Sequence, residues 1–352
     1  MKRLMFFNDW GEQDKPSSPL VAPPAQKLRQ LLAVALICLM LLLSVLSLAF
    51  LALAQGSGIV EGDVLNGSKG NEPVPGITVT LRIFDSSGAE KGTLTATTDE
   101  QGRFAFKGLD TDKSLLYVAE ANFQGISYQS PALSFAEGED KLLLPILVYE
   151  TTESDTEIVV EKAHFIFSFD PEEKAVLAME MYSVTNNGDR TFVTKEGKSL
   201  RFPLPPEVLE FDSDSLVLEG GEAFLPFPVS PGSMPQLVTF YYLLLAQGDS
   251  VEIKRQVLYP VESYNVFVKD SGFTVEVLGA RRGKDVVQAG EVYLNFAGEN
   301  LPKGGEITIK FSGLGKVGKV QRTSILWASA TAAVVALALF GLLLAYTFAR
   351  RR

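Results

Sequence analysis

The residues that most often carry enzymatic chemistry are scarce in this chain. Its 352 residues include one histidine, His164, and one cysteine, Cys38. A zinc site of usual composition needs about three or four histidine, cysteine or carboxylate ligands, and a nucleophile needs a base beside it. His164 alternates with Phe165 and Phe167, so we expect it on the solvent face of a strand rather than as a catalytic base. The sequence also has no phosphate-binding glycine loop and no dinucleotide fingerprint. It therefore predicts neither an enzyme nor a cofactor.

Paired carboxylates are the one catalytic chemistry that the composition leaves open. Acidic residues cluster at 137–140 and in two short pairs, which are Asp110 with Asp112 and Asp212 with Asp214. The two carboxyl groups of a glycosidase lie about 5–10 Å apart in space and need no fixed spacing in sequence. The same two pairs are the candidates for a calcium site, although calcium takes about six to eight oxygen ligands. We expect these residues to be solvated turn residues and no metal to be bound, with a carboxylate-based hydrolase of cell-surface polymers as an alternative.

A short motif, Asp99-Glu-Gln-Gly102-Arg-Phe104-Ala-Phe106, indicates how strands are joined. Asp99 can accept hydrogen bonds from turn amides, and Gly102 relieves a tight turn. Phe104 and Phe106 share one face of the strand that follows and are expected in a core. Similar short strands, punctuated by turns, are predicted around it at 77–83, 94–98, 115–121, 125–129 and 142–148. This spacing favours a β-sandwich.

The same region resembles the carboxypeptidase regulatory-like domain. The resemblance rests on segments 58–64, 73–81 and 98–106, and 117–121 with Tyr128 match its later half. It covers about residues 58–147. It implies a transthyretin-like sandwich that serves as an accessory module and not as the catalytic one.

A second β-rich region follows the segment 150–156, which has no apolar pattern and is predicted to be a linker. Alternating apolar residues and clustered prolines over 157–315 predict one larger sandwich of immunoglobulin-like type, against 58–149 for the first. The sequence from Asn186 to Asp189 predicts a hairpin turn. The arrangement resembles bacterial membrane-anchored proteins that pair such a region with a regulatory-like domain.

Two charge-free apolar segments flank the β-rich regions, at 31–54 and 325–349. Each is long enough, at roughly 36 Å of helix, to cross a bilayer. The segment 325–349 is predicted to span the membrane. The segment 31–54 is either a second transmembrane helix or a secretory signal cleaved after Ala54. In both cases the basic tail 350–352 and the N-terminal 1–30, predicted to be disordered, lie in the cytoplasm and the β region outside it.

The exported part is acidic. Between residues 55 and 323, 24 lysines and arginines face 39 aspartates and glutamates, so nucleic acid is excluded as a partner. The expected fold is all-β, with two extracytoplasmic sandwiches flanked by two hydrophobic helices. The expected function is a non-enzymatic binding or assembly module, anchored in the cell membrane, that contacts a protein or a glycan. An accessory subunit of a membrane complex is an alternative, in which Gly341 and Ala345 let the second helix pack closely against a partner.

Overall fold

The computed structural model describes residues 36, 40, 58–232 and 234–316, and within 58–316 its regular elements are strands and two short 3-10 turns. The prediction of an all-β, sandwich-like architecture is confirmed. In the described part of the chain, no helix is long and apolar enough to cross a membrane. Apart from Leu36 and Met40, the segments predicted at 1–54 and 325–352 lie outside the described residues.

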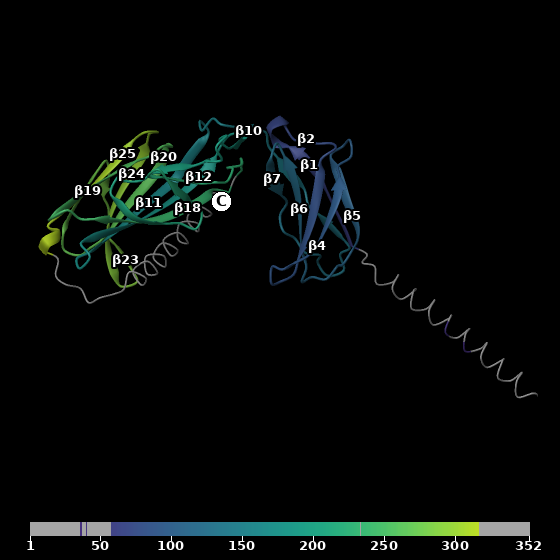
Figure 1. The fold of residues 1–352 in the computed structure, drawn as a ribbon, viewed down its shortest axis with the longest axis horizontal. Coiled ribbons are helices and arrows are strands. Elements are labelled where there is room, and N and C mark those ends of the chain that lie inside the picture. The colour runs from purple at the N-terminus through teal and green to yellow at the C-terminus, as the bar shows by residue number, and fades with distance from the viewer. Residues whose placement is uncertain (1–35, 37–39, 41–57, 233, 317–352) are drawn as a thin grey trace, which may run out of the picture.

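The first domain consists of two facing sheets (Figure 1). One sheet runs in the order β4-β3-β6-β7, and the other is built around β1, which pairs with β2, β5, β8 and β9. The core between them is a single cluster drawn from both sheets, including Val60 and Phe104 from one and Leu81 and Tyr117 from the other. The strands are β1 Gly58–Asn66, β2 Glu72–Pro73, β3 Thr78–Phe84, β4 Glu90–Thr97, β5 Arg103–Leu109, β6 Leu116–Phe123, β7 Ile126–Gln129, β8 Lys141–Leu143 and β9 Ile146–Val148, with the 3-10 turn η1 at Gly67–Lys69.

The second domain is larger and is dominated by an eight-stranded sheet. Its order is β15-β18-β12-β11-β20-β24-β22, with β23 also paired to β24. Two three-stranded sheets, β19-β25-β21 and β14-β17-β16, accompany it. The strands are β11 Ile158–Asp170, β12 Ala175–Asn186, β14 Arg201–Pro203, β15 Val208–Asp212, β16 Val217–Glu219, β17 Glu222–Phe224, β18 Gln236–Leu245, β19 Ser250–Gln256, β20 Val261–Lys269, β21 Thr274–Leu278, β22 Arg281–Arg282, β23 Val286–Gln288, β24 Glu291–Leu301 and β25 Glu306–Ser312, followed by the 3-10 turn η2 at Leu314–Lys316.

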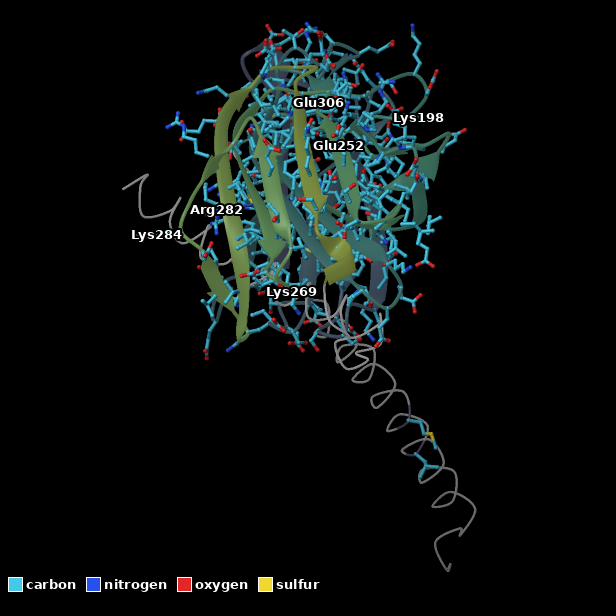
Figure 2. The ribbon with its side chains drawn as sticks, turned by 90° about the vertical axis from the view of Figure 1, so that its left-hand side faces the viewer. Lys198, Glu252, Lys269, Arg282, Lys284 and Glu306 are labelled. Carbon is cyan, nitrogen blue, oxygen red and sulfur yellow. The ribbon has the colours of Figure 1, made fainter. Side chains whose placement is uncertain are left out.

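Aromatic rings fill the space between the sheets of the second domain. Phe167 of β11 packs edge-on against Phe311 of β25 at 5.9 Å, and Phe273 reaches the same Phe311 ring at 5.7 Å. Edge-to-face pairs of this kind add to the stability that burial of apolar area supplies. Charged side chains such as Glu252, Lys269 and Arg282 lie on the surface of this domain (Figure 2).

The two domains meet at one end, near β2 and the short strand β10 (Thr151–Thr152) (Figure 1). β10 lies in the segment predicted to be a linker, and it pairs in parallel with β13 (Thr191–Phe192) of the second domain. The prediction of a hairpin turn at Asn186 to Asp189 was wrong. The hairpin of β12 lies at its other end, where β11 and β12 join, and the chain after Asn186 leaves the sheet to pair with β10.

Candidate functional site

The acidic pairs singled out in the sequence lie in turns and at an edge strand. The Asp110 Oδ1 accepts the backbone N–H of Asp112 at 3.0 Å, and the Asp112 Oδ1 accepts that of Ser114 at 2.9 Å. The Ser114 amide lowers the pKa of Asp112. Among the residues described, no three histidine, cysteine or carboxylate side chains come together as metal ligands would.

Asp212 ends the edge strand β15, opposite Tyr241 of β18. Burial and then the negative charges of Asp214 and Asp212 raise the pKa of Tyr241, so both carboxylates lie near this ring. Calcium takes about six to eight oxygen ligands, and one tyrosine beside two carboxylates does not supply that number. These residues therefore give no reason to assign a reaction or a cation to this edge.

The Asp99 motif closes the turn between β4 and β5. The Asp99 Oδ1 accepts the backbone N–H groups of Gln101 and Arg103, each at 2.9 Å, and the Arg103 amide lowers the pKa of Asp99. Gly102 has φ +73°, and a Cβ there would lie 2.8 Å from the Val64 carbonyl oxygen. The turn is thus held against β1.

The two phenylalanines of this motif follow directly on β5. Phe104 and Phe106 are both buried, with ring centroids 5.9 Å apart. Asp99 and Gly102 thus form the turn, and Phe104 and Phe106 belong to the core, as the sequence predicted. Gly341 and Ala345, proposed for helix packing, lie outside the described residues.

His164 is on the face of β11 opposite Phe165, as expected, but it does not face solvent. It is 6% exposed, and neither ring nitrogen has a hydrogen-bond partner in the part of the chain described. Its ring lies 5.6 Å from that of Phe267, beside the apolar cluster that includes Ile166 and Met179. Burial, and then the charge of Lys162, lower the pKa of His164 to about 4. The prediction failed because this face of the sheet also carries apolar side chains.

A buried polar cluster that sequence analysis missed crosses the core of the second domain. Glu180 of β12 and Arg255 of β19 form an ion pair with almost no exposed surface, in which Arg255 Nη2 lies 2.9 Å from Glu180 Oε2. The Tyr242 hydroxyl donates to Glu180 Oε1 at 2.6 Å, and the Tyr182 hydroxyl donates to Oε2. Arg255 also donates to the Pro203 carbonyl.

This cluster joins the two sheets and is closed to substrates. Both carboxylate oxygens of Glu180 are used by donors, and the hollow beside Arg255 measures about 10 Å³, enough for a single water. Burial, followed by the Glu180 charge, raises the pKa of Tyr182 and Tyr242 well above the usual value. Desolvation lowers the pKa of Arg255, but the interactions with Glu180, Tyr242 and Tyr182 together raise that pKa well above its usual value. Tyr182, Tyr242 and Arg255 therefore stay protonated, and the cluster serves to hold the two sheets together.

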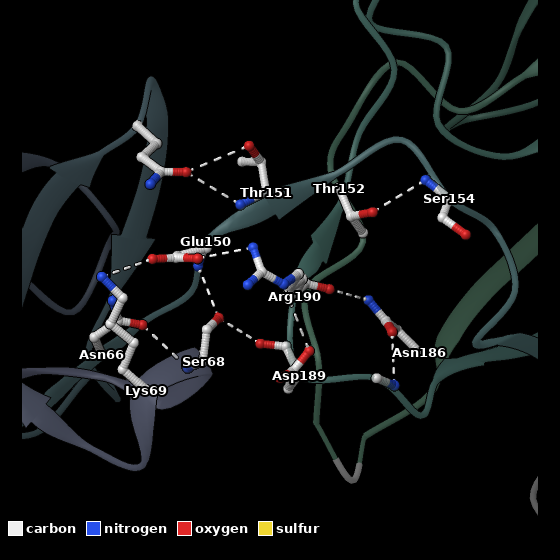
Figure 3. Close-up of polar contacts among 12 residues, drawn as sticks. Asn66, Ser68, Lys69, Glu150, Thr151, Thr152, Ser154, Asn186, Asp189 and Arg190 are labelled. Atoms are coloured by element: carbon white, nitrogen blue, oxygen red, sulfur yellow. Dashed lines mark hydrogen bonds and ion pairs between the residues drawn. The ribbon is translucent and has the colours of Figure 1, made fainter.

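The most extensive polar network between the domains is centred on Glu150 (Figure 3). Its carboxylate pairs with Lys69 of the first domain at 3.0 Å and with Arg190 of the second at 2.7 Å. The hydrogen bond from Lys69 and the charges of Lys69 and Arg190 lower the pKa of Glu150, against a smaller effect of burial. The backbone of Glu150 also takes part, because its carbonyl accepts the Thr191 N–H at 2.8 Å.

Ser68 adds a second link at the same place. Its hydroxyl accepts the Glu150 N–H at 2.9 Å and donates to the Asp189 carbonyl across the domain boundary. Asn66 holds Ser68 in position, since its side chain caps η1 by accepting the Ser68 N–H at 3.0 Å. A third link joins the Tyr128 hydroxyl to Thr191 Oγ1, 2.8 Å apart. We refer to these contacts of Ser68, Lys69, Tyr128, Glu150, Asp189, Arg190 and Thr191 as the junction.

A hollow of about 410 Å³ opens in the second domain next to the junction. Asn186 lies in its wall and connects the two, because its side-chain amide donates to the carbonyls of Arg190 and Val229, each at 2.8 Å. Ser230 also lines it and accepts a hydrogen bond from Thr191 at 3.2 Å. We refer to this feature as the junction hollow. Its lining residues are Val184, Asn186, Pro228, Val229, Ser230, Pro231, Gly232, Met234 and Gln236.

The chain around the junction hollow exposes large apolar side chains. Met234 is 89% exposed, and Phe227 and Leu237, which flank the lining segment, are also exposed. A hollow of this size with an apolar rim can receive part of a partner molecule. Comparisons with models of protein families and with curated proteins found no match to this chain.

Proposed function

We propose that this chain is a non-enzymatic binding or assembly module, anchored in the cell membrane, that contacts a protein partner outside the cytoplasm at the junction hollow. The observation that carries the proposal is the hollow itself, with an exposed apolar rim beside a junction that fixes the two domains relative to each other. A few side chains buried at the centre of a contact supply most of the binding energy in protein interfaces.

A protein partner fits the rim better than a glycan does. Met234 and Phe227 are exposed apolar side chains, which bind by burying apolar area, and the hollow has no charged lining residue. The acidic surface of the exported region favours a partner with a basic surface, because complementary charge speeds association. The same module would serve as the accessory subunit of a membrane complex.

The proposal also includes the identity of the domains and their location. The first domain is proposed to be a carboxypeptidase regulatory-like sandwich and the second an immunoglobulin-like one. The two apolar segments at 31–54 and 325–349 are proposed to place both outside the cytoplasm, as their length and flanking charges suggest.

The location is tested with a single exposed thiol. Replacing Met234 with cysteine, in a chain whose only native cysteine is changed by Cys38→Ser, gives a single exposed thiol at the rim. A membrane-impermeant maleimide should label it in intact spheroplasts. Labelling that requires lysis would overturn the extracytoplasmic location.

Binding is tested by site-specific photo-crosslinking in intact cells. A photoreactive residue at Met234 should give one reproducible adduct, and the matched control is Val287, which is 67% exposed on β23. The adduct should be lost when Phe227→Asp is combined with it. Equal adducts from both positions, or none from Met234, would overturn the junction hollow as a binding surface.

A further inference from the structure

Strand β4 forms a long open sheet edge of the first domain. β4 pairs with β3 on one side and, among the described strands, with none on the other. The opposite edge of this sheet is β7, whose Tyr128 belongs to the junction. The β4 edge is therefore the edge away from the second domain, and the junction does not cover it.

Leu94 in the middle of β4 lies on the core face of the sheet but is not covered by the core. It is directly opposite Leu81, which is fully buried, and its neighbour Ala96 is opposite the fully buried Val79. Opposed residues share a face of the sheet, so Leu94 points to the core side. It is nevertheless 42% exposed. The apolar face of this sheet thus extends to β4, which is one strand beyond the part that the core covers.

Other sheet edges in the described residues have features that discourage pairing with a further strand. Charges interrupt β5 at Lys107, β15 at Glu210, β19 at Glu252 and β21 at Glu276. β15 also has an irregular register, and β22, β23 and β7 are four residues long or shorter. Charges, bulges and shortness are the usual protections of exposed edges. The segment from Gly92 to Thr97 in β4 has no charge and an unbroken register with β3.

The sequence of this edge is complementary to itself. In an antiparallel pair centred on Leu94, the Leu94 side chains of two copies face each other on the core side, and Gly92 faces Ala96. On the outer side Thr93 faces Thr95, and threonine pairs across strands are favourable. Lys91 faces the uncharged Thr97, so no like charges are opposed.

We propose that the β4 edge is an interface for a second copy of this chain, paired antiparallel about Leu94. The two four-stranded sheets then form one continuous eight-stranded sheet, and each Leu94 is covered by that of the other copy. This interface lies on the first domain and is separate from the junction hollow, so the proposal does not depend on the proposed function.

The register gives a specific cross-linking test on the full chain in the Cys38→Ser background. Opposed residues in an antiparallel pair have Cα atoms about 4.5–5.5 Å apart, which is within the range of a disulfide. Copies carrying Thr93→Cys should therefore cross-link to copies carrying Thr95→Cys when the two are mixed and mildly oxidised. Two Thr95→Cys copies should not, because their Cα atoms would be about 8 Å apart, beyond disulfide reach. Leu94→Cys copies should cross-link alone, and the control Leu143→Cys, a leucine 60% exposed on β8, should remain single.

A second variant tests the interface without a cross-link. Leu94→Lys puts two positive charges opposite each other at the centre of the pair, and circular dichroism should show an unchanged fold because Leu94 is exposed. The native mass in detergent should fall from that of two chains to that of one. Any of three results would overturn the proposal. The parent chain could be single under these conditions, or the Leu94→Lys chain could stay paired. The third is that Thr95→Cys copies cross-link alone as well as in the mixture.

Discussion

The buried ion pair of Glu180 and Arg255 is expected to contribute much less net stability than the loss of one partner alone would suggest. Their side chains are 0% and 2% exposed and join β12 of the large sheet to β19 of the small one. The substitution Glu180→Gln keeps the shape of the side chain but leaves the Arg255 guanidinium buried without a counter-ion. Removing one partner of a buried pair costs about 3–5 kcal/mol. Since a domain is stable by only about 5–15 kcal/mol, this is a large share of the total.

Removing the whole cluster should cost far less than removing Glu180. Replacing both charges with apolar side chains of similar volume, Glu180→Leu with Arg255→Met, is neutral or stabilising in comparable proteins by about 1–4 kcal/mol. The hydroxyls of Tyr182 and Tyr242 would then be left unpaired, at about 1–3 kcal/mol each. Adding Tyr182→Phe and Tyr242→Phe removes that penalty, so the fourfold variant should recover most of the stability lost in Glu180→Gln.

The assay must report on the second domain alone. Hydrogen exchange in increasing urea measures the opening free energy of each region, with β12 and β19 as the reporters and β3 of the first domain as the internal control. Opening of β12 should become easier by several kcal/mol in Glu180→Gln while β3 is unchanged. A loss below about 1 kcal/mol, which is the size of a surface ion pair, would refute the argument. So would a fourfold variant that is no more stable than Glu180→Gln.

Three further outcomes follow from particular contacts. The pKa of His164 is about 4 in the folded chain and about 6.5 in the unfolded chain, so the unfolded chain binds more protons between these values. The free energy of unfolding should therefore decrease as the pH falls below 6.5, by about 2 kcal/mol at pH 5. Urea denaturation at pH 7 and pH 5 should show this loss in the parent and not in His164→Leu. Gly67→Ala would put a Cβ 2.4 Å from the Tyr149 ring, so proteolysis within 150–156 should become faster while both domains stay folded, and an unchanged rate would contradict it. Gly102→Ala should lower the melting temperature of the first domain by the equivalent of about 1–3 kcal/mol, since the residue has φ +73° and no room beside Val64; a change within error would show that the turn can relax.

The strands could be predicted well from local pattern because alternation reports burial directly. The strand predicted at 77–83 is present as β3, and Phe104 and Phe106 in β5 were expected in the core and are buried there. The same rule failed at His164, since alternation tells only which face a residue is on and not whether that face is covered. Glu180 in β12 and Arg255 in β19 each stand at a position where the alternation of the strand predicts a buried side chain. This pattern could have been used to predict the buried ion pair. An acid and a base that each interrupt the buried series of a strand must find a partner in the core.

The junction could not have been predicted, because each of its residues is ordinary in sequence. Glu150 stands in a polar segment with no periodicity, and Ser68 and Arg190 lie in turns. What makes them a site is that segments about 80 and 40 residues from Glu150 return to it, as the distances between Glu150, Lys69 and Arg190 show. Long-range proximity of this kind follows from the topology of both domains, and a local pattern carries no information on it.

The chemistry of the junction bears on what it can do. Its contacts are hydrogen bonds and partly exposed ion pairs, each of which adds little net stability. Several of them converge on Glu150 from both domains, so together they favour one orientation. Loss of one contact should then change how the domains are oriented far more than how stable each domain is. Because the wall of the junction hollow shares Asn186 with this network, the binding proposed there should depend on the junction even where the partner touches only the second domain.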